Sequence, residues 1–292
     1  MKIFQRKGKT HVFVLVIMIL ILVPLLTSTA WTIDKVTDLN TAEALASFDF
    51  SSGAGRIDRL LFDFYPKKLI TPDDFKKNTY KSSDPASKDR KTVSCATCRI
   101  ALHLKKGEVY GINADSATYA QKLWVDGKLL SSVGSVSETA KGFVPKTLNY
   151  AVYFTAVSDE TEIVIERSNF VHAYGDFFEL IIGPSQLITS MVNARLARIE
   201  LILGAMLTAS ILFLVAGLSF RSGKRLVSFA VVCAMIAVRS SFVNPKPVMV
   251  FLPDLNWYVG HKIECCSLYV AIFFLFSSTT LFSAAPYIRP CA

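Results

Sequence analysis

Four apolar stretches divide this chain of 292 residues and constrain its fold more than any other feature. The first covers residues 12–26, and the others cover residues 201–220, 226–243 and 263–282. Each of the last three approaches the roughly 20 residues that a helix needs to cross a hydrocarbon core about 30 Å thick. The segment 32–198 between the first two stretches reads as a soluble domain. The sequence therefore predicts a membrane protein that carries one large domain outside the bilayer core.

The charge of the chain follows the same division. The formal net charge is +9, yet residues 32–198 hold 21 lysines and arginines against 20 aspartates and glutamates. The basic excess therefore lies around the apolar stretches, where the cytoplasmic flanks of membrane helices are expected to be basic. Nucleic-acid binding would need a basic patch on a folded domain, which this distribution does not indicate. We expect membrane lipid around the helices and no nucleic acid among the partners.

The positions of the basic residues also predict the topology. Four of them precede the first apolar stretch and small residues follow it, as in a signal peptide or an uncleaved signal anchor over residues 1–31. Three more lie in the short loop 221–225, which the positive-inside tendency assigns to the cytoplasm. The chain is then expected to be a multi-pass protein of the plasma (inner) membrane, with residues 32–198 extracytoplasmic.

Short apolar runs separated by turn residues predict an all-β sandwich over residues 32–185. Asp126-Gly127 lies between two such runs and predicts a tight hairpin, because these residue types readily adopt positive φ angles. Residues 71–91 lack apolar periodicity and are expected to form a solvated loop. Apolar spacing over residues 186–200 predicts a juxtamembrane helix continuous with the first crossing. The predicted strands cover residues 60–65, 92–104, 108–112, 119–125, 128–133, 149–156, 162–168 and 177–182.

Several short motifs occur in a characteristic order. They are LLFDFY (60–65), LITPDDF (69–75), WVDGKLL (124–130) with VG (133–134), IERSNFVHAYG (165–175), IG (182–183), and KIE (262–264) with SLY (267–269). In this order the chain resembles, over about residues 45–282, bacterial seven-transmembrane receptors with diverse intracellular signalling modules. The resemblance implies a jelly-roll or galactose-binding-like sandwich as the extracytoplasmic sensor domain, followed directly by membrane helices.

The sequence departs from that family in its membrane region and at two positions of the sandwich. The family has seven helices after the sandwich and usually an output domain beyond them, whereas this sequence has three predicted helices before Ala292. Cys98 stands where the family tends to have an aromatic residue, and Asp176 where a second glycine is common. We therefore expect either a truncated receptor or one that works through an intracellular histidine kinase or another signalling partner.

Candidate ligand-binding residues lie on two segments. Asn169, His172 and Tyr174 follow a predicted strand, in a loop of the kind that holds ligand sites on sandwiches. They offer hydrogen bonds and a ring face for a sugar, although an asparagine after a strand also commonly makes a turn. Tyr119 and Trp124 offer rings on another strand, where Trp124 is either a binding platform or, the placement we favour, part of the core.

Arg239 and Glu264 fall inside or at the rim of the predicted membrane helices, where an unpaired charge is costly. We consider a pair between helices, with anchoring at the membrane interface as the favoured alternative. Cys95 and Cys98 have the CxxC spacing but no accompanying pair, and residues three apart on a strand point to opposite faces. A structural role is therefore favoured for both cysteines.

The motifs for common catalytic and cofactor sites do not occur in this sequence, so we expect no metal, no cofactor and no enzymatic activity in this chain. The leading hypothesis is a sensory receptor module whose sandwich binds a small-molecule or carbohydrate ligand and passes the event into the helices. The alternative is a membrane-anchored envelope or cell-wall interaction protein without a signalling role.

Overall fold

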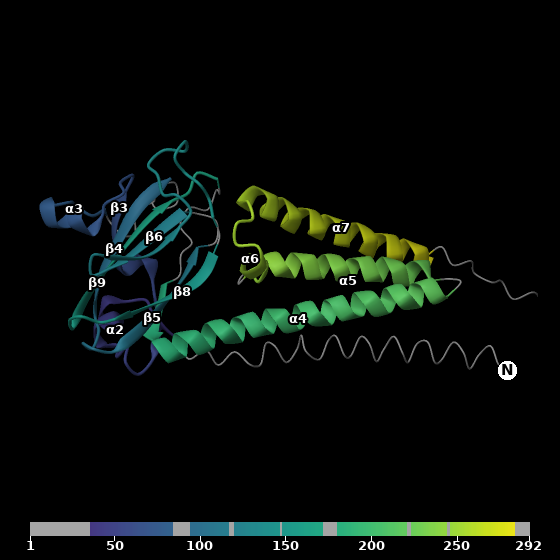
Figure 1. Ribbon diagram of the computed structural model, residues 1–292, viewed down its shortest axis with the longest axis horizontal. Helices are drawn as coiled ribbons and strands as arrows, with labels where there is room; N and C mark the ends of the chain where they lie inside the picture. Colours follow the sequence, from purple (N-terminus) through teal and green to yellow (C-terminus); the bar gives the residue numbers. More distant parts are fainter. Residues whose placement is uncertain are drawn as a thin grey trace, which may run out of the picture. The chain divides into compact units, whose positions relative to one another are not determined.

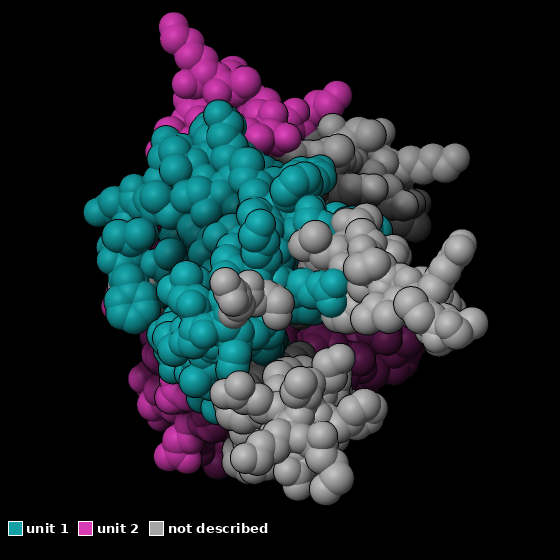
Figure 2. Space-filling view, turned by 90° about the vertical axis from the view of Figure 1, so that its right-hand side faces the viewer, with its two compact units in different colours: residues 1–33, 195–292 teal, residues 34–194 magenta. Residues whose placement is uncertain are grey.

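The computed structural model describes residues 36–83, 94–116, 120–146, 148–171, 180–220, 223–243 and 246–283 (Figure 1). The predicted signal segment, residues 1–31, lies outside these ranges. Residues 34–194 form one compact unit, and the described residues from Arg195 onward belong to a second (Figure 2). The boundary therefore falls close to the end of the predicted soluble domain.

The first unit contains two five-stranded sheets, which agrees with the predicted all-β sandwich. Sheet A has the strand order β1-β2-β10-β5-β8, and sheet B has the order β3-β4-β9-β6-β7. Neighbouring strands are antiparallel except β1 and β2, which are parallel. The strands are β1 Val36–Leu39, β2 Ala54–Ile57, β3 Asp63–Pro66, β4 Cys95–His103, β5 Val109–Ser116, β6 Ala120–Val125, β7 Lys128–Val133, β8 Leu148–Thr155, β9 Glu160–Ser168 and β10 Leu180–Pro184.

The core lies between the sheets and is built by alternation along each strand. On sheet A, Ile112 and Ile182 point into it, and on sheet B, Leu123 and Ile165 do, all four with no measurable exposure. Because side chains alternate along a strand, the neighbours of these residues lie on the two outer faces. The Asp126-Gly127 hairpin joins β6 and β7 with both residues at positive φ, 48° and 80°, as predicted.

Several short elements differ from the prediction. Strands β1 and β2 and the helix α2 (Ala42–Ser47) precede the first predicted strand, and their brevity gave no periodic signal. The predicted strand 60–65 is a 3-10 turn, η1 (Arg59–Leu61), followed by β3. The predicted loop 71–91 contains the helix α3 (Pro72–Lys77). Thr71 and Asp74 nucleate α3 with a reciprocal capping box, which stabilises a helix too short to show periodicity.

Three long helices follow the sandwich: α4 (Ser185–Ser219), α5 (Lys224–Phe242) and α7 (Trp257–Ser283), with the short α6 (Val248–Phe251) before α7. All three are long and apolar enough to cross a membrane. The predicted juxtamembrane helix and first crossing form one continuous helix, α4. Helix α7 begins six residues earlier than the predicted crossing, so Trp257 and Tyr258 lie in its first turn. Asn256 accepts a hydrogen bond from the Tyr258 backbone N–H (2.9 Å) at this end of the helix.

The first turns of α4 pack on the outer face of sheet A. Strand β10 ends at Pro184 and α4 begins at Ser185, so no loop separates them. Ile188 is fully buried and clusters with Met191, Ala54 and Ile181, the last two from β2 and β10. A Cβ atom at Gly111 of β5 would lie only 2.8 Å from Ile188 Cβ, so the glycine permits this close approach of helix and sheet.

Candidate functional site: a buried carboxylate on the outer face of sheet B

Sheet B carries an unusual polar row on the face that points away from the core. Strand β9 buries Ile163 and Ile165 in the core, and Glu162 and Glu166 alternate with them. The strand register aligns Glu166 with a residue of each other strand in sheet B. In strand order from β3 to β7, this row consists of Tyr65, Thr97, Glu166, Lys122 and Ser132.

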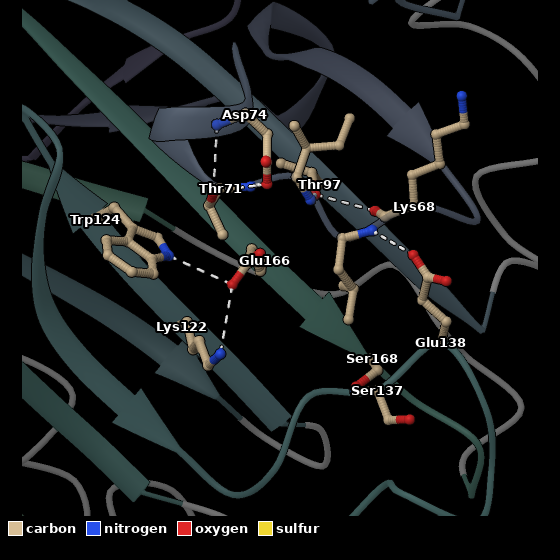
Figure 3. A network of polar contacts seen from close by, with 12 residues as sticks. Lys68, Thr71, Asp74, Thr97, Lys122, Trp124, Ser137, Glu138, Glu166 and Ser168 are labelled. Atoms are coloured by element: carbon tan, nitrogen blue, oxygen red, sulfur yellow. Dashed lines mark hydrogen bonds and ion pairs between the residues drawn. The ribbon is translucent and has the colours of Figure 1, made fainter. Parts of the chain in front are cut away.

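Residues 67–83 attach to the outer face of sheet B through Thr97. Thr97 Oγ1 donates to the carbonyl of Lys68 (3.0 Å) and accepts from the N–H of Ile70 (2.9 Å). Figure 3 shows these bonds beside the capping pair Thr71 and Asp74 of α3. Thr97 has no measurable exposure, so this part of the row is covered.

A second segment, residues 135–146, attaches to the C-terminal end of β9. Ser168 Oγ accepts a hydrogen bond from the Ser137 N–H (3.0 Å), and a β-bridge joins Ser135 to Val144. The two covering segments are also joined to each other, because Glu138 Oε1 accepts from the Leu69 N–H at 3.1 Å (Figure 3). Together the two segments cover one side of the polar row.

Glu166 is the buried acidic group of the row and is only 2% exposed. Trp124 Nε1 donates to its Oε2 at 3.4 Å, and Lys122 Nζ lies 3.8 Å from the same oxygen (Figure 3). Lys122 keeps 36% of its side-chain surface exposed, and Trp124 is half-buried. The side of Glu166 that Lys122 and Trp124 occupy is therefore the side nearest to solvent.

The electrostatics of the site are set by burial. Loss of solvent raises the pKa of Glu166 above its ordinary value of 4.5, and the opposing effects of Lys122 and Trp124 do not cancel it. The negative charge of Asp74 raises this pKa further. The pKa of Asp74 itself is lowered, because the Thr71 hydroxyl and N–H stabilise its carboxylate. The structure thus places a carboxyl whose pKa is raised beside one whose pKa is lowered.

One residue of this candidate site, Trp124, is also among the candidate ligand-binding residues named from the sequence. Trp124 lies on the outer face, so its favoured placement in the core was wrong: Leu123 and Val125, one position to either side, fill the core instead. Lys122 and Glu166 were not singled out as site residues. The alternation of Glu162-Ile-Val-Ile-Glu166 already places both acids on one face, but the covering segments that bury Glu166 leave no such signal.

The other predicted ligand-binding residues divide into two groups. Tyr119, His172 and Tyr174 lie outside the described residues. Asn169 is 8% exposed and follows β9, where its Oδ1 accepts from the Val171 N–H (3.1 Å) and its own N–H donates to the Ser94 carbonyl (2.6 Å). These bonds hold Asn169 in a turn, which was the alternative to ligand binding considered from the sequence.

Arg239 and Glu264 do meet between helices, but not as an ion pair of side chains. Arg239 Nη1 on α5 donates to the backbone carbonyl of Glu264 on α7 at 3.2 Å. The Glu264 carboxylate lies 3.7 Å from His261 Nδ1, one turn earlier on α7. His261 in turn stacks on Trp257, with ring centroids 5.2 Å apart. The Arg239 guanidinium therefore links α5 to the backbone of α7. The pairing considered from the sequence is corrected accordingly: Arg239 binds the Glu264 carbonyl and not its carboxylate.

The two cysteines of the sandwich are buried on β4. Cys98 belongs to the core between the sheets, whereas Cys95 aligns with Ser168 on the outer face, so the two point to opposite faces as expected. Burial raises the pKa of the Cys95 thiol, which keeps it protonated and unreactive. Within the described ranges, no group of three or more His, Cys, Asp or Glu side chains is arranged to hold a metal ion.

Neither protein-family models nor curated protein sequences match this chain. Among solved structures, a GH2 β-galacturonidase from Eisenbergiella tayi bound to galacturonate is 9% identical, with a TM-score of 0.30, over 48% of this chain and 26% of that one. A family 35 carbohydrate binding module from Clostridium thermocellum is 9% identical, with a TM-score of 0.22, over 47% of this chain and 96% of that one. The insecticidal δ-endotoxin Cry8Ea1 from Bacillus thuringiensis is 14% identical, with a TM-score of 0.23, over 51% of this chain and 25% of that one. The chain thus spans about a quarter of the galacturonidase, and TM-scores this low decide neither fold family nor ligand.

Proposed function

We propose that the chain is a membrane-bound sensory receptor module. Its sandwich binds a small ligand, a carbohydrate foremost, and its transmembrane helices relay the event to an intracellular output domain or signalling partner. One observation carries this proposal: β10 continues into α4 without a loop, and the first turns of α4 are packed on sheet A by Ile188 and Met191. A sandwich that served only as a tethered domain would not need the first turns of the helix packed on its sheet.

The sandwich offers separate faces to the ligand and to the helix. The Glu166 site lies on the outer face of sheet B, and α4 packs on the outer face of sheet A. Between them lies a core whose side chains, such as Ile165 and Ile182, are fully buried. Because a close-packed interior transmits displacement and does not absorb it, ligand binding at sheet B can move the residues that hold α4.

The proposal includes the topology and the fold family. The basic loop 221–225 supports a cytoplasmic position for the turn between α4 and α5, and hence an extracytoplasmic sandwich on a multi-pass protein of the plasma membrane. Two five-stranded sheets with a shared core support a jelly-roll or galactose-binding-like sandwich. The parallel β1–β2 pair is a departure from an entirely antiparallel jelly roll.

The test uses the full chain in lipid nanodiscs and a panel of methyl glycosides as probes. Hydrogen exchange, followed by mass spectrometry, reports separately on residues 160–168 of β9 and on residues 185–194 of α4. We expect at least one glycoside to slow exchange in β9 and to change exchange in α4. Trp124→Ala should abolish both effects, whereas Leu129→Ala, on the exposed edge strand opposite Trp124, should preserve them.

Two outcomes would contradict the receptor proposal. If no glycoside alters exchange in β9, the sandwich is not a sugar sensor. If a glycoside protects β9 but leaves residues 185–194 unchanged, the helices serve only as an anchor. That result would favour an envelope or cell-wall interaction protein.

A further inference from the structure

We infer that the Glu166 site takes a ligand that carries an ammonium group beside an apolar ring face, such as an amino sugar, and that Lys122 occupies the ammonium position in this structure. This inference rests on the proposed function, because it names the ligand class of the same site. The evidence for it is the set of contacts that Glu166 makes with Lys122 and Trp124, and their distances.

Glu166 makes poor contacts for a buried carboxylate. Charge-assisted hydrogen bonds between an ammonium or guanidinium and a carboxylate usually measure about 2.7–2.9 Å. Among the described residues, the two partners of Glu166 lie at 3.4 Å and 3.8 Å, both on Oε2. A carboxylate that is 2% exposed and so loosely paired has not recovered the solvation it lost.

Glu162 provides the comparison on the same strand and the same face. Its Oε1 accepts from Arg99 Nε at 2.6 Å, although its side chain keeps 26% of its surface exposed. The more exposed carboxylate is therefore tightly paired, and the more buried one is loosely paired. Structural stabilisation alone favours the reverse arrangement, since a buried charge costs more than an exposed one. Glu166 thus has capacity for a further donor.

The position next to Glu166 already accepts an ammonium group. Lys122 reaches the carboxylate from the solvent side, on a side chain that stays 36% exposed. The Lys122 side chain is long and partly exposed, so its ammonium can return to solvent when a ligand ammonium takes its place beside Glu166. A ligand ammonium would restore the compensating charge, whereas a ligand with hydroxyl groups alone would leave the buried carboxylate without an opposite charge.

Trp124 supplies the second half of the recognition. Its indole N–H points to Glu166, so the ring lies directly beside the carboxylate (Figure 3). An indole ring attracts cations and packs against the apolar face of a pyranose. An amine that carries a ring can therefore contact the Glu166 carboxylate and the Trp124 ring at once. Lys122 lies on β6, as Trp124 does, and its ammonium competes with the ligand for Glu166.

The test compares three probes on the full chain in nanodiscs by isothermal titration calorimetry: methyl β-glucosaminide, methyl β-glucoside and methyl β-glucuronide. Lys122→Met removes the competing ammonium but keeps the aliphatic stem, and it should tighten glucosaminide binding about fivefold. Glu166→Gln should weaken glucosaminide binding about tenfold or more, with the glucoside changed less than about twofold. Glu162→Gln is the matched control and should leave all three affinities unchanged. Native hydrogen-exchange protection in β4 and β9 verifies that each variant is folded.

The outcomes separate this inference from the proposed function. If Lys122→Met weakens glucosaminide binding, or if the glucuronide binds most tightly and depends on Lys122, the site selects an anion or a neutral sugar. The ammonium inference is then wrong, while sugar sensing stands. If none of the three glycosides binds and the wider panel leaves exchange in β9 unchanged, both the inference and the proposed function are overturned.

Discussion

Glu166 illustrates how the surroundings of one residue determine its chemistry. The strand alternation puts it on the outer face of sheet B, where a glutamate would ordinarily be solvated. The attached segments instead remove it from water, and its one charged partner among the described residues, Lys122, lies at 3.8 Å. The free-energy cost of burying this carboxylate can be measured from the pH dependence of stability.

Glu166→Gln should therefore change the pH dependence of stability. The folded-state pKa of Glu166 is raised above 4.5, so between these two values the folded chain binds more protons at this group than the unfolded chain. Its contribution to the free energy of unfolding consequently falls as pH rises through that window, and the loss is complete above the folded pKa. Glutamine does not titrate, so the stability of Glu166→Gln relative to wild type should increase from below pH 4.5 to neutral pH.

The measurement is the opening free energy of β9 amides, from hydrogen exchange corrected for intrinsic rates at each pH. A difference between variant and wild type that stays constant across the range would show that Glu166 is not desolvated. A difference that decreases with pH would show that Lys122 stabilises the carboxylate more than burial destabilises it.

At the scale of elements, the junction of β10 and α4 has the clearest physical requirement. A helix can lie this close to a sheet only where the sheet lacks a side chain, and Gly111 provides that space under Ile188. Because Ile188 is fully buried, neither partner has room to shift. This contact holds the beginning of α4 in place.

Gly111→Ala should therefore loosen the first turns of α4. The added methyl would lie 2.8 Å from Ile188 Cβ, and overpacking of this kind typically costs about 1–3 kcal/mol. Exchange should accelerate in residues 185–194 more than in β4 or β9. Gly53→Ala is the matched control, because its nearest neighbour would be Phe48 Cζ at an acceptable 3.4 Å. Equal effects of the two substitutions would refute the packing argument.

The link between α5 and α7 supports a second prediction at this scale. Arg239→Met removes the guanidinium that donates to the Glu264 carbonyl, and should lower the stability of the helices by about 1–3 kcal/mol. Unfolding in micelles with increasing SDS measures this loss. Arg239→Lys keeps the charge but not the planar guanidinium: full rescue by lysine would instead support simple anchoring at the membrane interface.

At the scale of the whole molecule, the chain combines two kinds of surface. The sandwich balances acidic and basic residues, whereas the helices expose large apolar side chains such as Leu218, Tyr269 and Phe276. Apolar helix surfaces of this kind suit contact with lipid and are unfavourable in water. Each unit therefore matches a different solvent, which agrees with the proposed topology.

The topology is testable by cysteine labelling in intact cells, in a background in which Cys265, Cys266 and Cys291 are each replaced by serine. Lys106→Cys introduces an exposed thiol on the sandwich, and Lys224→Cys introduces one at the start of α5. A membrane-impermeant maleimide should label the first position in intact cells and the second only after permeabilisation. Labelling of both positions in intact cells, or the reverse order, would contradict an extracytoplasmic sandwich.

The features predicted most accurately from the sequence are those encoded locally. The β7 strand matched its predicted bounds, and Asp126-Gly127 formed its hairpin, because both depend on residue preferences within a few positions. The long apolar runs likewise predicted the three helices, since their length and hydropathy are properties of the segment itself. By contrast, β1, β2 and α3 were missed because four to six residues are too few to show a period.

The sequence by itself determined that this chain has a β-rich domain and apolar helices, because hydropathy and the alternation of apolar and polar residues are properties of each local segment. Only the tertiary structure decided which polar residues are buried together. Glu166, Lys122 and Thr97 become neighbours through strand register, and segments distant in sequence cover part of their row. The same holds for Gly111 and Ile188, whose contact depends on the packing of α4 on sheet A. Burial arises from contacts between distant segments, and local patterns do not specify which segments those are.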